Sequence, residues 1–121
     1  MTNNYQRGQK DTRPWGTWEV IDCGNGFCVK RIVVNPSGIL SLQSHQFRSE
    51  HWIIVEGVAT VTLDEQKFEK NAGESVYISA LTKHRIQNSS AKPMTFIEVQ
   101  CGENLDEDDI VRYEDVYGRV K

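Results

Sequence analysis

"LSLQSHQFRSEHWIIVEG", residues 40–57, places two histidines, a glutamine and a glutamate just before an apolar run that ends at glycine. In a β-strand, residues two apart share a face, so Gln43 and His45 point the same way. Glu50 has the parity of Trp52, and if that indole faces a core, Glu50 faces the core too. The stretch therefore predicts two strands whose buried face carries groups with the chemistry of metal ligands.

Short runs rich in β-branched and aromatic residues, separated by turn formers, continue on both sides of this stretch. Many short strands with regular turn signals are typical of a sandwich or barrel. The tail over residues 104–119 opens with acids that suit the positive end of a helix dipole, and it predicts a short C-terminal helix. The expected strands are Phe27–Val34, Leu40–His45, His51–Val55, Val58–Leu63, Lys67–Glu69, Val76–Ser79, Arg85–Asn88 and Met94–Gln100.

Length and composition bound the class of protein. At 121 residues, with 38% apolar and 26% charged side chains, the chain fits one globular domain. The net charge of -3 argues against a nucleic-acid partner, because there is no basic excess to neutralise phosphates. No apolar run reaches the roughly 18 residues that a membrane span needs, and the N-terminus lacks the apolar segment of a signal peptide. We therefore expect a cytoplasmic protein that binds neither nucleic acid nor membrane.

His84 opens the run "HRIQN" and is the expected donor from a distant strand. Two imidazoles, one carboxylate and one amide oxygen make a mixed nitrogen and oxygen site for one divalent metal ion, with room for substrate oxygens. Zinc is the first expectation, and manganese, cobalt, nickel and iron also fit. The alternative is that Gln43, His45 and Glu50 are solvated rim residues and His84 is a turn residue.

The spacing of these residues favours the metal site. The patterns S-x5-Q-x-H-x4-E-x6-G, from Ser37 to Gly57, and G-x5-S-x-L-x2-H-x3-N, from Gly73 to Asn88, resemble the two cupin motifs. The resemblance implies an all-β fold, the cupin double-stranded β-helix, which is a closed jelly-roll barrel. Glutamine can still offer an oxygen to a metal. The cupin pattern differs at four positions, with glycine at Ser37, histidine at Gln43, and proline and glycine at Ser79 and Leu81.

Longer stretches carry a closer resemblance: "RPWG" at 13–16, "VKRIVVNPSG" at 29–38, the opening stretch, and "IEVQCGENLDEDDIVRYEDVYGR" at 97–119. They look like the C-terminal domain of type II mannose-6-phosphate isomerases, which usually follows a mannose-1-phosphate guanylyltransferase domain in one long chain. The resemblance implies a free-standing cupin domain over residues 13–121, after an N-terminal extension over residues 1–12. Phe47 stands where the family commonly has a second histidine, and we expect this difference to leave metal binding unaffected.

The resemblance implies a metal-dependent sugar-phosphate isomerase that interconverts mannose 6-phosphate and fructose 6-phosphate. This reaction moves a proton between C2 and C1, so a general base must lie beside the metal without serving as a ligand. Lys30 and Glu98 are the candidates, because each lies in an otherwise apolar strand where burial would perturb its pKa. The alternative for each is an outward-facing strand charge. Phosphate favours a planar, permanently charged donor, and the expected substrate-binding residues are Arg48, Arg85, Arg112 and Arg119.

Two other functions share this ligand set. A cupin with iron in the site could activate oxygen, and a module that has lost a pocket residue could bind a sugar phosphate without converting it. His51 neighbours Glu50 but should face the opposite way. Trp15 and Trp18 are expected to pack or to contact a partner subunit, and we expect a homodimer.

Overall fold

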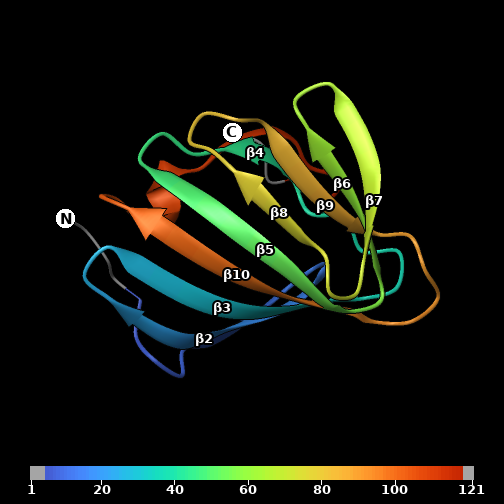
Figure 1. Cartoon of the computed structure of the whole chain (residues 1–121), viewed down its shortest axis with the longest axis horizontal. Helices are drawn as coiled ribbons and strands as arrows, with labels where there is room; N and C mark the ends of the chain where they lie inside the picture. Colours follow the sequence, from blue (N-terminus) through green and yellow to red (C-terminus); the bar gives the residue numbers. More distant parts are fainter. Residues whose placement is uncertain (1–4, 119–121) are drawn as a thin grey trace.

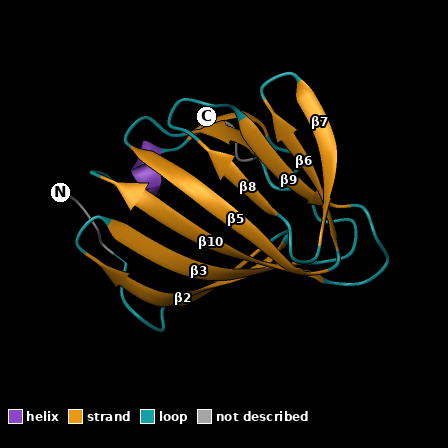
Figure 2. Cartoon of the chain, in the orientation of Figure 1, coloured by secondary structure: helices purple, strands orange, loops and turns teal. Residues whose placement is uncertain are grey.

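The computed structural model describes residues 5–118, and almost all of its regular structure is β-strand (Figures 1 and 2). The strands form two antiparallel sheets, as expected for a jelly-roll barrel. The larger sheet runs, in spatial order, β1 (Lys10–Arg13), β2 (Gly16–Gly24), β3 (Phe27–Val34), β10 (Met94–Gly102), β5 (Arg48–Glu56) and β8 (Ser75–Ile78). The smaller sheet runs β11 (Val111–Glu114), β4 (Leu42–Ser44), β9 (His84–Asn88), β6 (Val58–Leu63) and β7 (Gln66–Asn71).

All eight expected strands are present, and their ends differ from the predicted ones by at most three residues. The sequence patterns missed β1, β2 and β11. The C-terminal helix is a single 3-10 turn, η1 (Glu107–Asp109), and the prediction of helix beyond it is wrong. Val111–Glu114 pairs with β4 instead, because edge pairing there outweighs the local helix signal. Within residues 5–118, no helix is long and apolar enough to cross a membrane.

The inner face of the larger sheet changes from apolar to polar halfway along its three central strands. Strand pairing aligns these changes, so one end of the barrel holds an apolar core and the other end holds buried polar groups. The parity expected from the sequence is confirmed, since Glu50 shares the buried face of Trp52. The change falls at Ile32 and Lys30 in β3, at Phe96 and Glu98 in β10, and at Trp52 and Glu50 in β5.

The hairpin of β1 and β2 closes one side of the apolar core. Trp15 and Trp18 are each 6% exposed, which confirms that they are packing residues. Gly16 lets the hairpin lie close to β3, because a Cβ at this position would sit 2.0 Å from the carbonyl oxygen of Val33. The N-terminal segment continues the same packing, with the ring of Tyr5 edge-on to that of Trp18.

Two departures from the cupin pattern lie in turns that favour glycine. Ser37 and Leu81 have φ angles of 65° and 71°, in the left-handed region where a Cβ atom is strained. The turn at Leu81 forms all the same, and its N–H donates to the carbonyl oxygen of His45 over 2.7 Å. This hydrogen bond connects the turn before His84 to the loop that carries His45. The connection forms even though Leu81 departs from the cupin pattern.

Replacing Leu81 with glycine should stabilise the fold by up to about 1 kcal/mol. Relief of the left-handed strain, ~1–2 kcal/mol, exceeds the ~0.5–1 kcal/mol of chain entropy that glycine adds to the unfolded state. The side chain is 69% exposed, so little buried area is lost. Urea unfolding of the Leu81→Gly and Leu81→Ala variants measures the effect, with alanine as the control that keeps the strain. A glycine variant no more stable than the alanine variant would contradict the argument.

Candidate metal centre and its pocket

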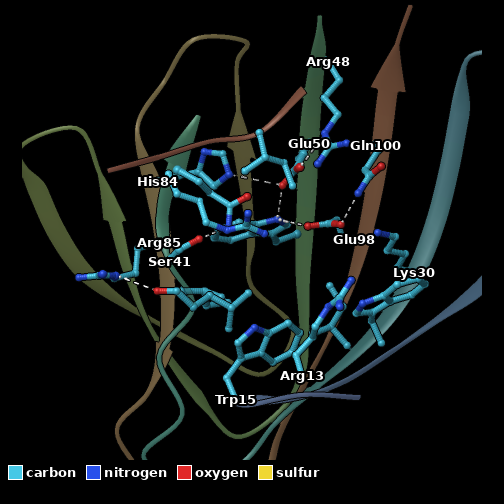
Figure 3. A pocket seen from close by; sticks show the side chains of 18 of the residues that line it. Arg13, Trp15, Lys30, Ser41, Arg48, Glu50, His84, Arg85, Glu98 and Gln100 are labelled. Carbon is cyan, nitrogen blue, oxygen red and sulfur yellow. Dashed lines mark hydrogen bonds and ion pairs between the residues drawn. The ribbon is translucent and has the colours of Figure 1, made fainter. Parts of the chain in front are cut away.

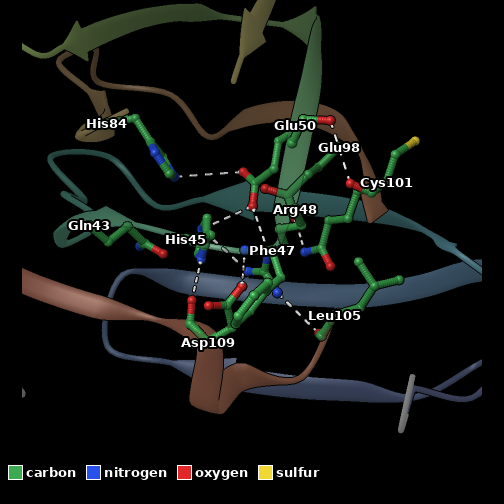
Figure 4. Close-up of polar contacts among 12 residues, drawn as sticks. Gln43, His45, Phe47, Arg48, Glu50, His84, Glu98, Cys101, Leu105 and Asp109 are labelled. Atoms are coloured by element: carbon green, nitrogen blue, oxygen red, sulfur yellow. Dashed lines mark hydrogen bonds and ion pairs between the residues drawn. The ribbon is translucent and has the colours of Figure 1, made fainter. Parts of the chain in front are cut away.

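Three buried side chains from different parts of the chain meet at the polar end of the barrel (Figure 4). His45 follows β4, Glu50 lies in β5 and His84 opens β9, and their ligand atoms all lie within 4.8 Å of one another. Nε2 of His45 is 3.1 Å from Oε2 of Glu50, and Nε2 of His84 is 3.8 Å from Oε1. The structure thus brings together three of the four ligands predicted from the sequence, in a group that can hold a metal ion.

Hydrogen bonds turn the same nitrogen of both imidazoles toward Glu50. Nδ1 of His45 lies 3.0 Å from the carbonyl oxygen of Asp109, and Nδ1 of His84 lies 2.9 Å from that of Thr82. A carbonyl oxygen only accepts, so each Nδ1 carries a proton, and Nε2 is the nitrogen of each ring that is directed at Glu50 and available to a metal. Burial lowers the pKa of His84, which favours the neutral ring that coordinates metals.

Glu50 supplies the negative charge of the group although it is buried. Burial by itself would raise its pKa, but the hydrogen bond with His45 and the charge of Arg48 hold that pKa well below its usual range. Nε of Arg48 lies 3.3 Å from Oε2, and Nε1 of Trp52 donates to Oε1 over 3.1 Å. An ionised carboxylate between two imidazole nitrogens is a donor set that suits a divalent transition metal.

Gln43, the fourth predicted ligand, stands directly opposite His84 in the pairing of β4 and β9. Its amide nitrogen donates to the hydroxyl of Ser41 over 3.0 Å, so the atom that it can offer to a cation is Oε1. The side chain is half-buried, and Figure 4 shows it beside His45. Its role as a ligand stays a prediction.

Asp109, from η1, fixes the loop that carries His45. Its carboxylate oxygens accept hydrogen bonds from the backbone N–H groups of Gln46 and Phe47, over 3.1 and 3.0 Å, while its carbonyl oxygen binds His45. Asp109 therefore positions His45 in two ways. It makes two charge-assisted hydrogen bonds to the backbone of the loop and one hydrogen bond to the imidazole itself. The acids of the tail therefore serve the site rather than a helix.

A pocket opens beside the three ligands, and both imidazole-bearing and charged side chains line it. Five cationic side chains line it against two carboxyl groups, although the whole chain carries a net charge of -3. Both predicted proton carriers face inward, so the alternative of an outward strand charge is excluded for Lys30 and Glu98. The cationic residues are Arg13, Lys30, Arg48, Arg85 and Arg112, and the acids are Glu50 and Glu98.

Glu98 lies next to the ligand group without belonging to it (Figure 3). Nε1 of Trp52 lies 3.1 Å from Oε1 of Glu98 and the same distance from Oε1 of Glu50, and the amide of Gln100 donates to Oε2 of Glu98 over 2.7 Å. Burial, followed by the negative charge of Glu50, raises the pKa of Glu98 to about 7. A carboxyl group in this setting can both accept and release a proton near neutral pH.

The arginines predicted to bind substrate differ in how the protein holds them. Arg48, Arg85 and Arg112 line the pocket, and Arg119 lies outside the described residues. Arg85 donates through Nε to the carbonyl oxygen of Leu40 over 2.9 Å, and its two terminal nitrogens lie 3.3 and 3.2 Å from oxygens of Glu114. These contacts tie β11 to the barrel, and substrate binding by the arginines stays a prediction.

Several lining residues were not selected from the sequence. Ser41 and Gln100 share the parity of Gln43 and Glu98, so strand alternation could have found them. Arg13 and Tyr5 carry no such signal, because they belong to the N-terminal segment and its hairpin, which were not expected as strands. The pocket residues missed are Tyr5, Arg13, Ser41 and Gln100.

His51 and Phe47 stay out of the metal group, as the sequence predicted. His51 is exposed on the outer face of the larger sheet, with its ring 4.6 Å from that of Tyr77. The side chain of Phe47 is 46% exposed, and its backbone N–H binds Asp109. Neither residue displaces a ligand.

Comparisons with known proteins show the family of this chain. The profile of the family described as mannose-6-phosphate isomerase C-terminal matches residues 1–115. Alginate biosynthesis protein AlgA of Pseudomonas syringae is 50% identical over 107 residues, which are 88% of this chain and 22% of that protein. A mannose-1-phosphate guanylyltransferase of Escherichia coli is 45% identical over 108 residues, 89% of this chain and 23% of that protein. The chain thus spans less than a quarter of the length of these relatives.

The fold has solved counterparts as well. A Klebsiella pneumoniae protein with a double-stranded β-helix domain superposes with a TM-score of 0.74 at 17% identity, over 87% of this chain and 90% of that one. Oxalate decarboxylase from Lactobacillus farciminis superposes with a TM-score of 0.71 at 23% identity, over 78% of this chain and 31% of that one. At these identities the likeness establishes the cupin barrel alone.

Removing one imidazole ligand should abolish stable metal binding. His45→Ala and His84→Ala each delete a donor whose nitrogen is already oriented, so both should lose the single equivalent of divalent metal that the wild type retains after dialysis. Elemental analysis measures the metal, and His51→Ala is the matched control. If His45→Ala and His84→Ala each keep a full equivalent, the ligand assignment is wrong.

Truncating Asp109 should weaken metal binding without touching a ligand. Asp109→Ala frees the N–H groups of Gln46 and Phe47 and loosens the loop of His45, so metal affinity should fall roughly 10- to 100-fold. Titration calorimetry with zinc compares it with Asp108→Ala, which removes the neighbouring exposed acid. Equal affinities of the two variants would show that Asp109 does not position His45.

Proposed function

We propose that this chain, which belongs to the mannose-6-phosphate isomerase C-terminal family, is a metal-dependent isomerase that interconverts mannose 6-phosphate and fructose 6-phosphate. One observation carries the proposal. The His45, Glu50 and His84 group opens into a pocket that has an excess of cationic side chains and one carboxyl group left over for proton transfer. A metal site, a base and a positive pocket are what an aldose–ketose isomerase of sugar phosphates requires.

The anionic nature of the ligand follows from the pocket's charge. Five cationic side chains face two carboxyl groups in a protein that is acidic overall, so the positive potential is concentrated at the pocket. A phosphate group brings the charge that this potential favours. A neutral sugar would gain nothing from this potential.

His45, Glu50 and His84 would hold the metal ion, with Gln43 as the fourth ligand. The bound ion would act as a Lewis acid on neighbouring carbonyl and hydroxyl oxygens of the open-chain sugar. Zinc is our first choice, since two neutral imidazoles and a carboxylate are among its preferred donors. Manganese, cobalt, nickel and iron accept the same set.

Glu98 is the residue we assign to proton transfer. Its carboxylate would take the proton from C2 of the aldose and deliver it to C1, while the hydroxyl proton passes from O2 to O1, so the carboxylate ends the reaction as it began. Trp52 and Gln100 hold the two oxygens of Glu98 in place, which limits the carboxylate to one orientation toward the pocket. For the reverse reaction the proton leaves C1 and returns to C2.

Replacing Glu98 with glutamine should remove turnover while the metal stays bound. The amide keeps the shape and the hydrogen-bond donors nearby, yet it cannot carry the proton, so kcat should fall by at least roughly 100-fold. A coupled assay with mannose 6-phosphate, run beside elemental analysis, measures both quantities. Glu69→Gln, at an exposed acid of β7, is the control.

Assays of the wild-type protein distinguish the isomerase, the oxygenase and the non-catalytic binding module. Metal-dependent conversion supports the isomerase, and oxygen uptake by the iron-loaded protein would instead indicate an oxygenase. Binding of mannose 6-phosphate without any conversion would make the chain a sugar-phosphate-binding module. Full activity of Glu98→Gln with metal bound would move proton transfer to another residue.

A further inference from the structure

Lys30 is a buried ammonium group whose direct contacts are all neutral. It is 6% exposed, its Nζ donates to the hydroxyl of Tyr5 over 2.9 Å, and it lies 4.0 Å and 4.4 Å from the ring centres of Tyr5 and Trp18. Within the described part of the chain, Lys30 forms no ion pair. A buried charge without an opposite charge is unstable, so Lys30 favours an anion that comes from outside the protein.

Glu98 does not fill that need, although it stands directly opposite Lys30 in the pairing of β3 and β10. Its oxygens accept from Trp52 and Gln100 rather than from the ammonium group. The other buried cation differs in this respect. Arg48 contacts the buried carboxylate of Glu50, so its charge is balanced by the protein itself.

Arg13 reaches the same aromatic ring from the end of β1. Its guanidinium carbon lies 5.8 Å from the ring centre of Trp18, within cation–π range. Its ion pair with Asp11, 2.9 Å long, joins side chains that are 29% and 46% exposed. Exposed pairs of this kind contribute little, so the guanidinium adds positive charge beside Lys30 at this side of the pocket.

Tyr5 adds a polar group at the same place. An ammonium group only donates, so the phenolic oxygen accepts from Lys30 and its own proton must go to a different acceptor. We propose that Arg13, Lys30 and Tyr5 form an anion subsite that takes the phosphate group of the substrate. The identity of that substrate as a hexose 6-phosphate rests on the function proposed above.

The position of this subsite matches the substrate's chemistry. In Figure 3, Lys30 lies beyond Glu98 as seen from His84, and Arg13 lies below Glu98; both cations are at the ring of Trp18. In an open-chain hexose 6-phosphate, the phosphate and the reacting C1 and C2 are likewise at opposite ends. Phosphate at Lys30 therefore lets C1 and C2 reach Glu98 and the metal ligands. Lys30 becomes a substrate-binding residue, in place of the proton carrier that its strand position first indicated.

The test uses the metal-loaded chain and mannitol 1-phosphate, an open-chain hexitol phosphate that cannot isomerise, with mannitol as the unphosphorylated control. Titration calorimetry should give tighter binding of the phosphate. Lys30→Met and Arg13→Gln should each weaken it roughly 10- to 100-fold, since each removes a charged hydrogen bond, and Tyr5→Phe roughly 2- to 10-fold. Arg31→Gln is the matched control, because Arg31 follows Lys30 in β3 but faces outward and pairs with Glu19.

Metal content and thermal unfolding show that each variant is loaded and folded, and Arg13→Gln keeps the test open if Lys30→Met fails to fold. Affinity that survives both changes, or that falls instead in Arg112→Gln, overturns the subsite and leaves the isomerase proposal standing. The converse is also distinguishable. A wild type that never isomerises a sugar phosphate, but whose affinity for mannitol 1-phosphate depends on Arg13 and Lys30, supports the subsite and refutes the isomerase.

Discussion

The buried carboxylate of Glu50 is the constraint on which the polar end of the barrel depends. An anion at 3% exposure is stable only if donors and positive charge surround it. Its contacts come from the loop after β4, from its own strand β5 and from β9, so satisfying one charge fixes the two sheets relative to each other. A divalent ion at this point would add positive charge beside Glu50, which would couple metal binding to folding.

Both terminal segments complete the site over long sequence separations. The bond from His45 to Asp109 joins residues 64 apart, and that from Lys30 to Tyr5 joins residues 25 apart. The apolar half of the barrel needs neither contact, since its strands pack face to face through Phe96. The same strands thus carry the apolar core at one end of the barrel and the buried polar groups of the candidate site at the other end.

Strand alternation predicted the central strands and the inward direction of His45 and Glu50, because those facts are local to the chain. The same reasoning left the direction of Lys30 open, since a shift of one residue reverses a strand's faces. Arg13 could not be found locally, because its place in the pocket depends on β1 folding back over β2. The acids from Asp106 to Asp109 favoured a helix for a sound local reason, but the carboxylate of Asp109 accepts hydrogen bonds from the backbone of Gln46 and Phe47, in a loop far earlier in the chain.

The pairing of the buried cations explains how one small pocket can both hold a substrate and act on it. Arg48 faces the buried carboxylate of Glu50, so its charge is largely cancelled and stabilises the fold around the metal group. Lys30 faces aromatic rings and a hydroxyl, and in a low-dielectric interior its uncancelled charge acts strongly on an incoming anion. On the proposed function, binding energy gained at the phosphate would orient C1 and C2 of the sugar beside Glu98.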